Sequence, residues 1–380
     1  MKYCSQCLEP STRPGNIWDN PDICTACEYF DSTKNIYWPD RFEVLENLVT
    51  KTKKKNKTSQ YDCIVGVSGG KDSTRQALYI RDNLGLNPLL VCMSYPPSQV
   101  TDLGAKNLSN LIRLGFDIEI IGPSPILWKK LIKGAFFKFS NWGKATEMAL
   151  FSAVPIMAIN YDIPLVIWGE NPGLQIGDKD MLGKNGWDGN NMKSGNTLAG
   201  GDISWMEDLG VTEKDLYFFQ YPGEKEFESN DINIIYLGWF LGDWNFITNG
   251  RTSLSYGLSP RVNSPLETGD VSSVSSLDED WVIFNQMIKY YKFGFGKTTE
   301  YVNEQIRMGN ISRDEAIELV KKYDGKCADG YIESFCKYIG ITNKDFWEVV
   351  DQNVNMELFI STGVQGKYIP KFEVGRGIND

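Results

Sequence analysis

Residues 68–74 combine glycines, hydroxyls and charged side chains in an order suited to binding phosphate. They follow an apolar run at 61–67, which we expect to be a buried strand, and they lead into a helix over 74–80. Glycines let the backbone come close to an anion, and the unpaired N–H groups at a helix start point toward it. The turn therefore predicts a phosphate site made by Ser68, Gly69, Gly70, Lys71, Asp72, Ser73 and Thr74.

This turn differs from a Walker A loop, because its two glycines are adjacent and an Asp follows the Lys. It resembles instead the SGGxDS signature of the PP-loop ATP pyrophosphatases, which cleave ATP to AMP and pyrophosphate. The resemblance implies that residues 68–74 bind ATP. An ordinary tight turn, with Asp72 and Ser73 as helix caps, is the alternative interpretation.

A second chemical signal lies at the N-terminus, where two CxxC pairs are separated by sixteen residues. This spacing is typical of a four-cysteine zinc ribbon. We expect one structural zinc, away from the chemistry, to supply the folding energy of this short segment. An iron–sulfur cluster is the alternative. The expected ligands are Cys4, Cys7, Cys24 and Cys27, and we expect the other cysteines, Cys63, Cys92, Cys327 and Cys336, to be buried thiols.

The sequence contains no histidine. This excludes a Ser-His-Asp triad, a Cys-His glutaminase triad and any histidine metal ligand. Residues 1–2, Met-Lys, offer no N-terminal nucleophile either. We therefore expect that the chain does not hydrolyse glutamine and that any ammonia it uses comes from solution or from a separate glutaminase.

Composition limits the possible partners. The 380 residues carry a net charge of −10, which argues against the basic face of a nucleic-acid enzyme. We expect the lysine-rich run at 51–57 to be a solvated linker. No apolar run approaches the roughly 20 residues of a membrane span, and the first residues lack the apolar core of a signal peptide. We therefore expect a cytoplasmic protein without membrane contact.

Strand-like and helix-like segments alternate from residue 61 onward. We expect strands at 61–67, 87–93, 116–121 and 163–168, with helical segments at 102–114 and 126–160 between them. This alternation predicts an α/β fold, with a parallel sheet of Rossmann-like, PP-loop type. Ligands of such sheets bind at the carboxyl ends of the strands, where both the 68–74 turn and Gly169-Glu170-Asn171 would lie.

The domain prediction has four parts. We expect a zinc ribbon at 1–40, a linker at 41–60, a PP-loop ATP pyrophosphatase domain at 61–275 and a helical region at 276–380. A stretch rich in Gly, Asn and Asp at 172–210 has little periodicity and is expected to be a lid.

Five further motifs follow the cysteine pairs and the PP-loop. They are Gly-Glu-Asn at 169–171, Tyr-Leu-Gly at 236–238, Lys-Phe-Gly-Phe-Gly-Lys at 292–297, Gln-Ile-Arg-Met-Gly at 305–309 and Ile-Ser-Arg-Asp-Glu-Ala at 311–316. This order resembles the N-acetyl sugar amidotransferase family (WbpG/PseA type) of bacterial surface-polysaccharide biosynthesis. The resemblance implies an ATP- and Mg²⁺-dependent ligase that converts the acetamido group of a free or nucleotide-linked sugar into an acetamidino group. It also implies a partner glutaminase and cyclase-like subunit related to those of histidine biosynthesis. The expected products include O-antigen or pseudaminic/legionaminic-type sugars.

Residue types then suggest roles. Asp72 and Glu170 are candidate catalytic carboxylates, for Mg²⁺ binding or proton transfer, and Lys71 either contacts phosphate or points away. Asn171, Lys297 and Arg307 are candidate contacts to the sugar or its anionic group. Helix capping, a strand-end turn and surface salt bridges are the corresponding structural alternatives.

Two other functions share these motifs. A PP-loop tRNA-thiolating enzyme would need a persulfide-carrying cysteine or a cluster near the loop, together with a basic face. A zinc-ribbon adaptor would bind nucleotide without catalysis.

Overall fold

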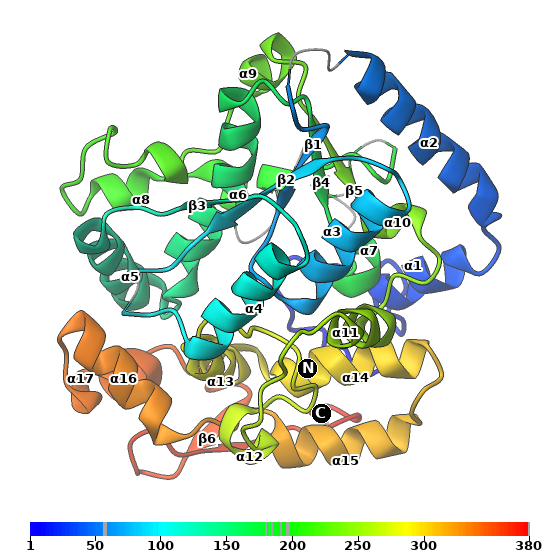
Figure 1. The fold of residues 1–380 in the computed structure, drawn as a ribbon. Helices are drawn as coiled ribbons and strands as arrows, with labels where there is room; N and C mark the ends of the chain where they lie inside the picture. The colour runs from blue at the N-terminus through cyan, green and yellow to red at the C-terminus, as the bar shows by residue number, and fades with distance from the viewer. Residues whose placement is uncertain are drawn as a thin grey trace.

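The centre of the molecule is a five-stranded parallel sheet with the strand order β3-β2-β1-β4-β5 (Figure 1). The computed structural model describes residues 1–55, 59–96, 98–178, 181, 183, 185–190, 192–194 and 198–378. The strands are β1 (Cys63–Gly66), β2 (Pro88–Met93), β3 (Ile118–Ile121), β4 (Leu165–Trp168) and β5 (Asn233–Tyr236). The expected parallel α/β fold is confirmed, and β5 is a strand that the sequence analysis did not predict.

The sheet is buried on both faces, which explains why its central strands read as continuous apolar runs. On one face, Ile64 and Val166 pack into a core with α5 (Pro125–Phe139) and α6 (Gly143–Asn160). On the other face, Val65 and Ile167 pack with α2 (Trp38–Lys55), α3 (Lys71–Asp82) and α4 (Asp102–Arg113).

The order of the strands in the sheet determines where a ligand can bind. The strands β1, β2 and β3 extend the sheet in one direction, whereas β4 and β5 extend it from the opposite side of β1. The point where strand order reverses leaves a crevice at the carboxyl ends of β1 and β4. The turn at 68–74 and the segment at 169–171 leave these two strands, so the topology brings them together.

Residues 41–60 were predicted to be a linker, and this is wrong for most of the segment. Residues 38–55 form the helix α2, in which Leu45 and Val49 are buried against the sheet. The lysines at 51, 53 and 54 are exposed, as expected of a solvated run, and residues 56–58 lie outside the described part of the chain.

The segment 172–210, predicted as a lid, is anchored where it is described. Met192, Leu198, Trp205 and Met206 are buried in the main core, and Gly189 donates a backbone hydrogen bond to Ile234 of β5. Residues 179–180, 182, 184, 191 and 195–197 lie outside the described residues. A lid made of the whole segment does not fit these anchors.

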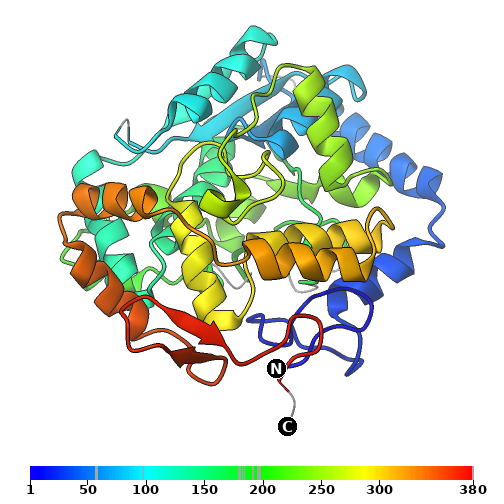
Figure 2. The same cartoon turned by 90° about the horizontal axis from the view of Figure 1, so that it is seen from below.

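Most of the remaining helices lie around the carboxyl ends of the strands and below them, whereas α9 lies at the amino ends, just before β5 (Figures 1 and 2). They are α1 (Thr25–Thr33), α7 (Pro172–Gln175), α8 (Ser204–Glu207), α9 (Glu224–Ser229), α10 (Leu237–Phe240), α11 (Phe246–Ser255), α12 (Pro265–Thr268), α13 (Val282–Phe293), α14 (Lys297–Arg307), α15 (Arg313–Tyr323), α16 (Asp329–Ile339) and α17 (Asn343–Asp351). Short 3₁₀ turns lie at η2 (Met192–Ser194), η3 (Ala199–Gly201) and η4 (Tyr217–Phe219), and a hairpin pairs β6 (Phe359–Ser361) with β7 (Tyr368–Pro370).

The cysteine-rich N-terminal segment packs against the C-terminal helices. The Leu8 backbone N–H donates to Asn303 Oδ1 of α14 at 2.7 Å, and Arg313 of α15 donates to the Cys7 carbonyl at 3.2 Å. The Ile378 N–H donates to the Met1 carbonyl, so both ends of the chain meet on the same side of the molecule (Figure 2). Within the described residues, no helix is both long enough and apolar enough to cross a membrane.

The helical C-terminal region shares a core with the sheet domain. The Phe136 ring of α5 is fully buried, and it contacts Phe335 of α16 at 5.1 Å and stacks on Phe346 of α17 at 5.2 Å between ring centroids. The adjacent Phe137 is 47% exposed. These aromatic contacts fix α16 and α17 to the helix layer beneath the sheet.

Phe136→Ala is therefore expected to lower the free energy of unfolding by about 3–5 kcal/mol, because it leaves a cavity among three packed rings. Phe137→Ala is the matched control and should cost less than about 1 kcal/mol. Urea unfolding followed by tryptophan fluorescence measures both. Equal losses in the two variants would contradict the shared core.

Candidate active site

The turn at 68–74 has the geometry of an anion cradle. Gly69 adopts a φ of +80°, and a Cβ at this position would lie 2.8 Å from the Leu108 backbone nitrogen of α4. A side chain is therefore excluded both by the left-handed backbone and by the close approach of α4. Gly70 is the residue before α3 and has no side chain to cap it, so the first N–H groups of α3 remain available to an anion.

Lys71 and Asp72, the first charged residues of the loop, form an ion pair with each other. Lys71 Nζ lies 2.6 Å from Asp72 Oδ2 and 4.0 Å from the centre of the Phe246 ring, and Asn249 donates to Asp72 Oδ1 at 2.7 Å. Burial alone would raise the pKa of Asp72, but the Lys71 ammonium and the Asn249 amide hold the pKa below its ordinary value. Both Asp72 oxygens are thus engaged within the protein.

Residues of α11 form hydrogen bonds with the start of α3 and stabilise this arrangement. Ser253 donates to the Lys71 carbonyl at 2.6 Å, and the Arg75 guanidinium donates to Asn249 Oδ1 at 2.5 Å and pairs with Asp243 at 2.7 Å. Such contacts hold the start of α3 in place, so the cradle is organised before any anion binds.

Glu170 follows β4 and faces the loop. Burial and the nearby Asp72 charge raise its pKa to about 7, although a backbone hydrogen bond and Lys71 act in the opposite direction. Its Oε2 is buried and has no hydrogen-bond partner among the described residues. A carboxyl with this pKa and a free oxygen can exchange a proton near neutral pH or accept a metal ion.

A cavity of about 310 Å³ lies between the loop and Glu170. The sequence analysis placed Ser68, Gly70, Lys71, Asp72, Ser73, Glu170 and Lys297 in a site, and all seven line this cavity. Lys297 is the first residue of α14, a helix that is far from the loop in sequence. Val91, Met93, Phe151, Val154 and Trp168 supply an apolar wall. We call this space the PP-loop cavity.

The sequence analysis missed one wall of the PP-loop cavity. Residues 274–278 line it, and burial raises the pKa of Asp278 to about 6. This wall includes the expected boundary between the PP-loop domain at 61–275 and the helical region at 276–380. Two serines near this boundary, Ser273 and Ser276, have positive φ values of 60° and 48°, which indicates a conformation fixed by its surroundings.

Two predicted substrate contacts lie outside this lining. Asn171 is buried, caps α7 by accepting from the Leu174 N–H at 3.3 Å, and donates to the Gly238 carbonyl at 3.3 Å. Arg307 faces the cysteine cluster, with one nitrogen 4.0 Å from Cys7 Sγ and another donating to the Leu174 carbonyl at 3.2 Å. Neither side chain lines the PP-loop cavity.

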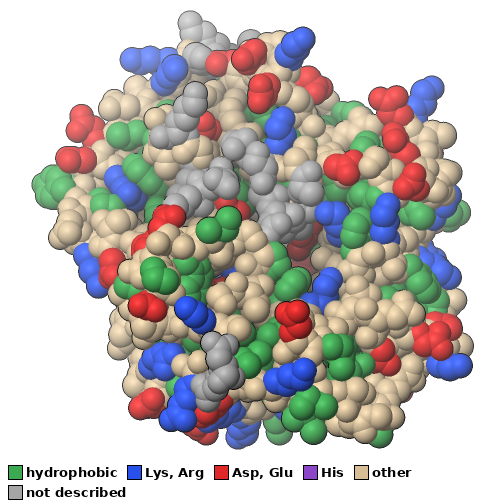
Figure 3. Space-filling view, turned by 180° about the vertical axis from the view of Figure 1, so that it is seen from behind, with side chains coloured by type: hydrophobic (Ala, Val, Ile, Leu, Met, Phe, Trp, Pro, Cys, Tyr) green, Lys and Arg blue, Asp and Glu red, His purple; other side chains and the backbone are tan. Residues whose placement is uncertain are grey.

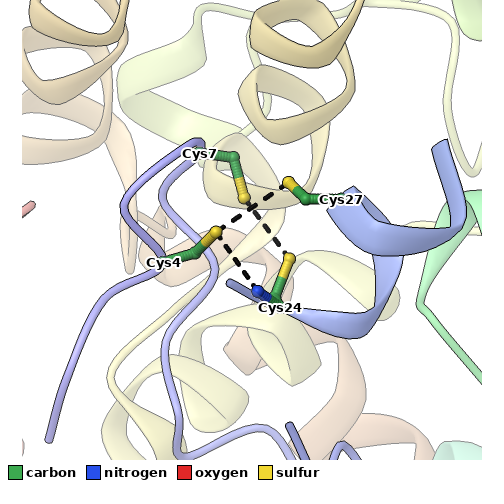
Figure 4. Close-up of side chains that lie close together, drawn as sticks. All are labelled: Cys4, Cys7, Cys24 and Cys27. Carbon is green, nitrogen blue, oxygen red and sulfur yellow. Dashed lines mark hydrogen bonds between the residues drawn. The ribbon is translucent and has the colours of Figure 1, made fainter. Parts of the chain in front are cut away.

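The four N-terminal cysteines converge on one point (Figure 4). They are fully buried, and their sulfur atoms all lie within 4.8 Å of one another. Cys7 and Cys24 are 3.7 Å apart, and Cys4 and Cys27 are 3.9 Å apart. Four thiolates around a tetrahedral zinc, each with a bond of about 2.3 Å, would be separated by about 3.8 Å. The spacing fits a single ion, whereas a cluster of several iron and sulfide atoms needs a wider opening.

Two backbone N–H donors and one cation lie next to the cysteine sulfur atoms. The Cys24 N–H donates to Cys4 Sγ at 3.3 Å, the Glu9 N–H donates to Cys7 Sγ at 3.4 Å, and Arg307 adds a full positive charge. Four thiolates and one Zn²⁺ carry a net charge of −2, which these donors offset. The cluster is therefore suited to holding zinc.

The isolated cysteines differ from these four. Cys63, Cys92 and Cys336 are buried, and burial raises the pKa of Cys92 to about 12 and that of Cys336 to about 11. Cys327 is half-buried, and burial raises its pKa to about 12. These thiols lack the depressed pKa of a sulfur-transferring cysteine. Among the described residues, the face shown in Figure 3 mixes Lys and Arg with Asp and Glu and shows no broad basic patch.

One family model matches the chain. Residues 269–369 match "LPS biosynthesis protein WbpG-like, C-terminal domain". The chain carries a WbpG-like C-terminal domain. The expected resemblance is thereby confirmed, and the WbpG-like domain includes Lys297, which lines the PP-loop cavity. A PP-loop joined to this domain supports an ATP-utilising enzyme of amidotransferase type.

Two solved structures show weaker likeness. The NMN synthetase from Francisella tularensis has 13% sequence identity and a TM-score of 0.29, covering 60% of this chain and 99% of that one. The NH3-dependent NAD synthetase from Campylobacter jejuni subsp. jejuni NCTC 11168, in complex with the nitrate ion, has 18% identity and a TM-score of 0.29, covering 60% of this chain and 100% of that one. TM-scores this low support no inference. No curated protein matches the sequence.

Purified protein is expected to contain one zinc per chain, and Cys24→Ser should lose it and fold in lower yield, because the metal stabilises the ribbon. Elemental analysis and circular dichroism measure the two effects. Cys327→Ser, outside the cluster, is the control and should keep its zinc. Iron and sulfide with a visible absorbance band would overturn the assignment of zinc.

Proposed function

We propose that this chain is an ATP-dependent amidotransferase that converts the acetamido group of a sugar into an acetamidino group, with AMP and pyrophosphate as products. The observation that carries the proposal is the position of Lys297. The WbpG-like domain places this residue on the wall of the PP-loop cavity, so the domain that gives the family resemblance also helps to build the nucleotide site.

The chemistry explains why an amide needs ATP. The amide oxygen is a poor leaving group, so ammonia cannot displace it directly. Attack of that oxygen on the α-phosphorus of ATP forms a P–O bond and releases pyrophosphate. Ammonia then adds to the activated carbon, and the C–O bond breaks to release AMP, which retains the former amide oxygen. One proton leaves the added nitrogen as the amidine forms.

The residues of the cavity match these steps. N–H groups at the start of α3 and the Lys297 ammonium would stabilise the charge that develops on pyrophosphate. Glu170 Oε2, which has no partner among the described residues, would accept the proton lost from ammonia or bind magnesium. Trp168 and Phe151 offer an apolar surface to the nucleotide base.

Magnesium fits this site as an ion shared between ATP and the protein. Its usual protein ligands are one or two carboxylates, with phosphate oxygens and water completing the shell. Glu170 and Asp278 line the PP-loop cavity and could hold it, whereas both oxygens of Asp72 are already engaged. When bound, magnesium would neutralise charge on the leaving pyrophosphate.

The source of ammonia follows from composition. With no histidine in the sequence, no Cys-His pair can hydrolyse glutamine. We therefore propose that ammonium supports turnover by the isolated chain and that glutamine supports it after a separate glutaminase is added.

Mass spectrometry of N-acetylated sugars and sugar nucleotides incubated with ATP, Mg²⁺ and ammonium tests the function. Each converted acetamido group should lose about one mass unit, with one pyrophosphate released per conversion.

Asp72→Ala and Ser73→Ala should both abolish pyrophosphate release while circular dichroism stays unchanged. Pyrophosphate release that needs tRNA instead of sugar would indicate thiolation, and nucleotide binding without turnover would indicate an adaptor.

Glu170 makes the reaction pH-dependent. Its ionised form is needed either to accept a proton or to bind magnesium, so kcat/KM should rise through the pKa of about 7 as pH increases from 6 to 8. Glu170→Gln should lose about a hundredfold or more of the activity and should lack this pH step. If Glu170 binds magnesium, the variant should also need more Mg²⁺ for half-maximal activity. A pH profile identical in wild type and Glu170→Gln would remove this residue from the mechanism.

A further inference from the structure

A second cavity, of about 430 Å³, is not lined by the PP-loop. It lies where four parts of the chain meet: the ribbon at 13–16, the α5–α6 junction at 140–147, the end of α7 and the residues after it at 176–178, and the segment from α13 to the first turn of α14 at 285–300. We call it the ribbon-facing cavity. None of the steps described above uses its residues.

Buried polar atoms without partners among the described residues line the ribbon-facing cavity. They are Asn16 Nδ2, Ser140 Oγ, Asn285 Oδ1 and Gln286 Oε1. An unpaired buried polar atom costs free energy, so native proteins keep such atoms where a ligand or water binds them. A mixture of donors and acceptors on several walls is complementary to the hydroxyl groups of a sugar ring.

Ser140 is the most informative of the four. It is 1% exposed and adopts a left-handed conformation with a φ of 48° at the end of α5, where glycine is the usual residue. Glycine would relieve the backbone strain and would also remove the hydroxyl. The chain keeps a serine with its Oγ unpaired in a cavity, which indicates a ligand for that hydroxyl.

The charged side chains that line the ribbon-facing cavity also favour an anionic ligand. Its cationic side chains are Arg13, Lys144, Lys289 and Lys292. Of the acids near them, Glu9 pairs with Arg13, Glu300 pairs with Arg13 and Lys289, Asp178 lies on one wall, and burial raises the pKa of Glu147 to about 7. Near neutral pH the lining therefore carries a net positive charge.

The ribbon-facing cavity lies next to the reaction centre. A smaller apolar cavity of about 170 Å³ shares Ile176 and Asp178 with it, and shares Phe151 and Glu170 with the PP-loop cavity. A ligand with its polar body between ribbon and α13 could thus extend an acetamido group toward Glu170, with the methyl group against apolar side chains.

We infer that the ribbon-facing cavity binds the acceptor, a hydroxyl-rich sugar that carries a carboxylate or phosphate, and that the ribbon forms part of the acceptor site through Arg13 and Asn16. This inference rests on the proposed function for the identity of the reacting group. The binding site itself can be tested without turnover. It also revises the expectation that the ribbon lies away from the chemistry.

Isothermal titration with three probes tests the inference: N-acetylneuraminate, UDP-N-acetylglucosamine and UDP. At least one of the two sugars should bind, and saturating α,β-methylene-ATP should not displace it. Binding of N-acetylneuraminate would indicate that the anion is a carboxylate, and binding of UDP-N-acetylglucosamine more tightly than UDP would indicate a diphosphate. Failure of both sugars to bind at millimolar concentration, or their displacement by the ATP analogue, would overturn the inference.

Ser140→Gly and Gln286→Met should each weaken sugar binding about three- to tenfold, as expected for one lost hydrogen bond, and should leave binding of the ATP analogue unchanged. Ser140→Gly should keep or raise the melting temperature, because glycine suits the left-handed backbone. Asp162→Gly is the matched control, since Asp162 is an exposed left-handed residue (φ 54°) before the amino end of β4. Unchanged sugar binding in both cavity variants would refute the assignment, whether or not the enzyme proves to be an amidotransferase.

Discussion

One half-buried carboxylate, Glu300 of α14, joins parts of this molecule that are far apart in sequence. It lies 3.3 Å from the Arg13 guanidinium of the ribbon, 2.8 Å from the Lys289 ammonium of α13 and 3.7 Å from Lys297 at the PP-loop cavity. Burial would raise its pKa, but these three cations outweigh that effect and hold the pKa of Glu300 far below its ordinary value. Without this charge, three partly buried cations would lose their shared counter-ion, while Arg13 would keep its pair with Glu9. The ribbon, the C-terminal helices and the nucleotide site therefore depend on a shared ion network.

Much of the fold could be predicted because its signals are local. The PP-loop and the cysteine pairs each lie within a few residues of sequence, and the strands β1 to β4 are short apolar runs between helices. The strand β5 was missed because its four residues follow a long irregular segment. The helix α2 was missed because its lysine-rich end obscured Leu45 and Val49, which are four residues apart and face the core.

The site was harder to predict because it depends on contacts between distant segments. The type and spacing of residues 68–73 and of Glu170 sufficed to place them, since strand order alone brings them together. Asn171 and Arg307 have side chains suited to recognising a sugar, yet their partners are a neighbouring turn and the cysteine cluster. No local sequence pattern marks residues 274–278 or the polar atoms of the ribbon-facing cavity. Each of them becomes part of a site because it packs beside segments more than a hundred residues away.

The position of Arg307 has a consequence for how the protein responds to oxidants. Its guanidinium contacts Cys7 Sγ and also donates to the Leu174 carbonyl of α7, the short helix that begins directly after Glu170 and Asn171. A change in the charge or spacing of the thiolates would therefore be transmitted through one side chain to the segment that carries Glu170. Oxidation of the cysteines, with release of the metal, would disturb this segment while leaving the PP-loop in place. The cysteine cluster and the segment that carries Glu170 are thus linked through the contacts of one side chain.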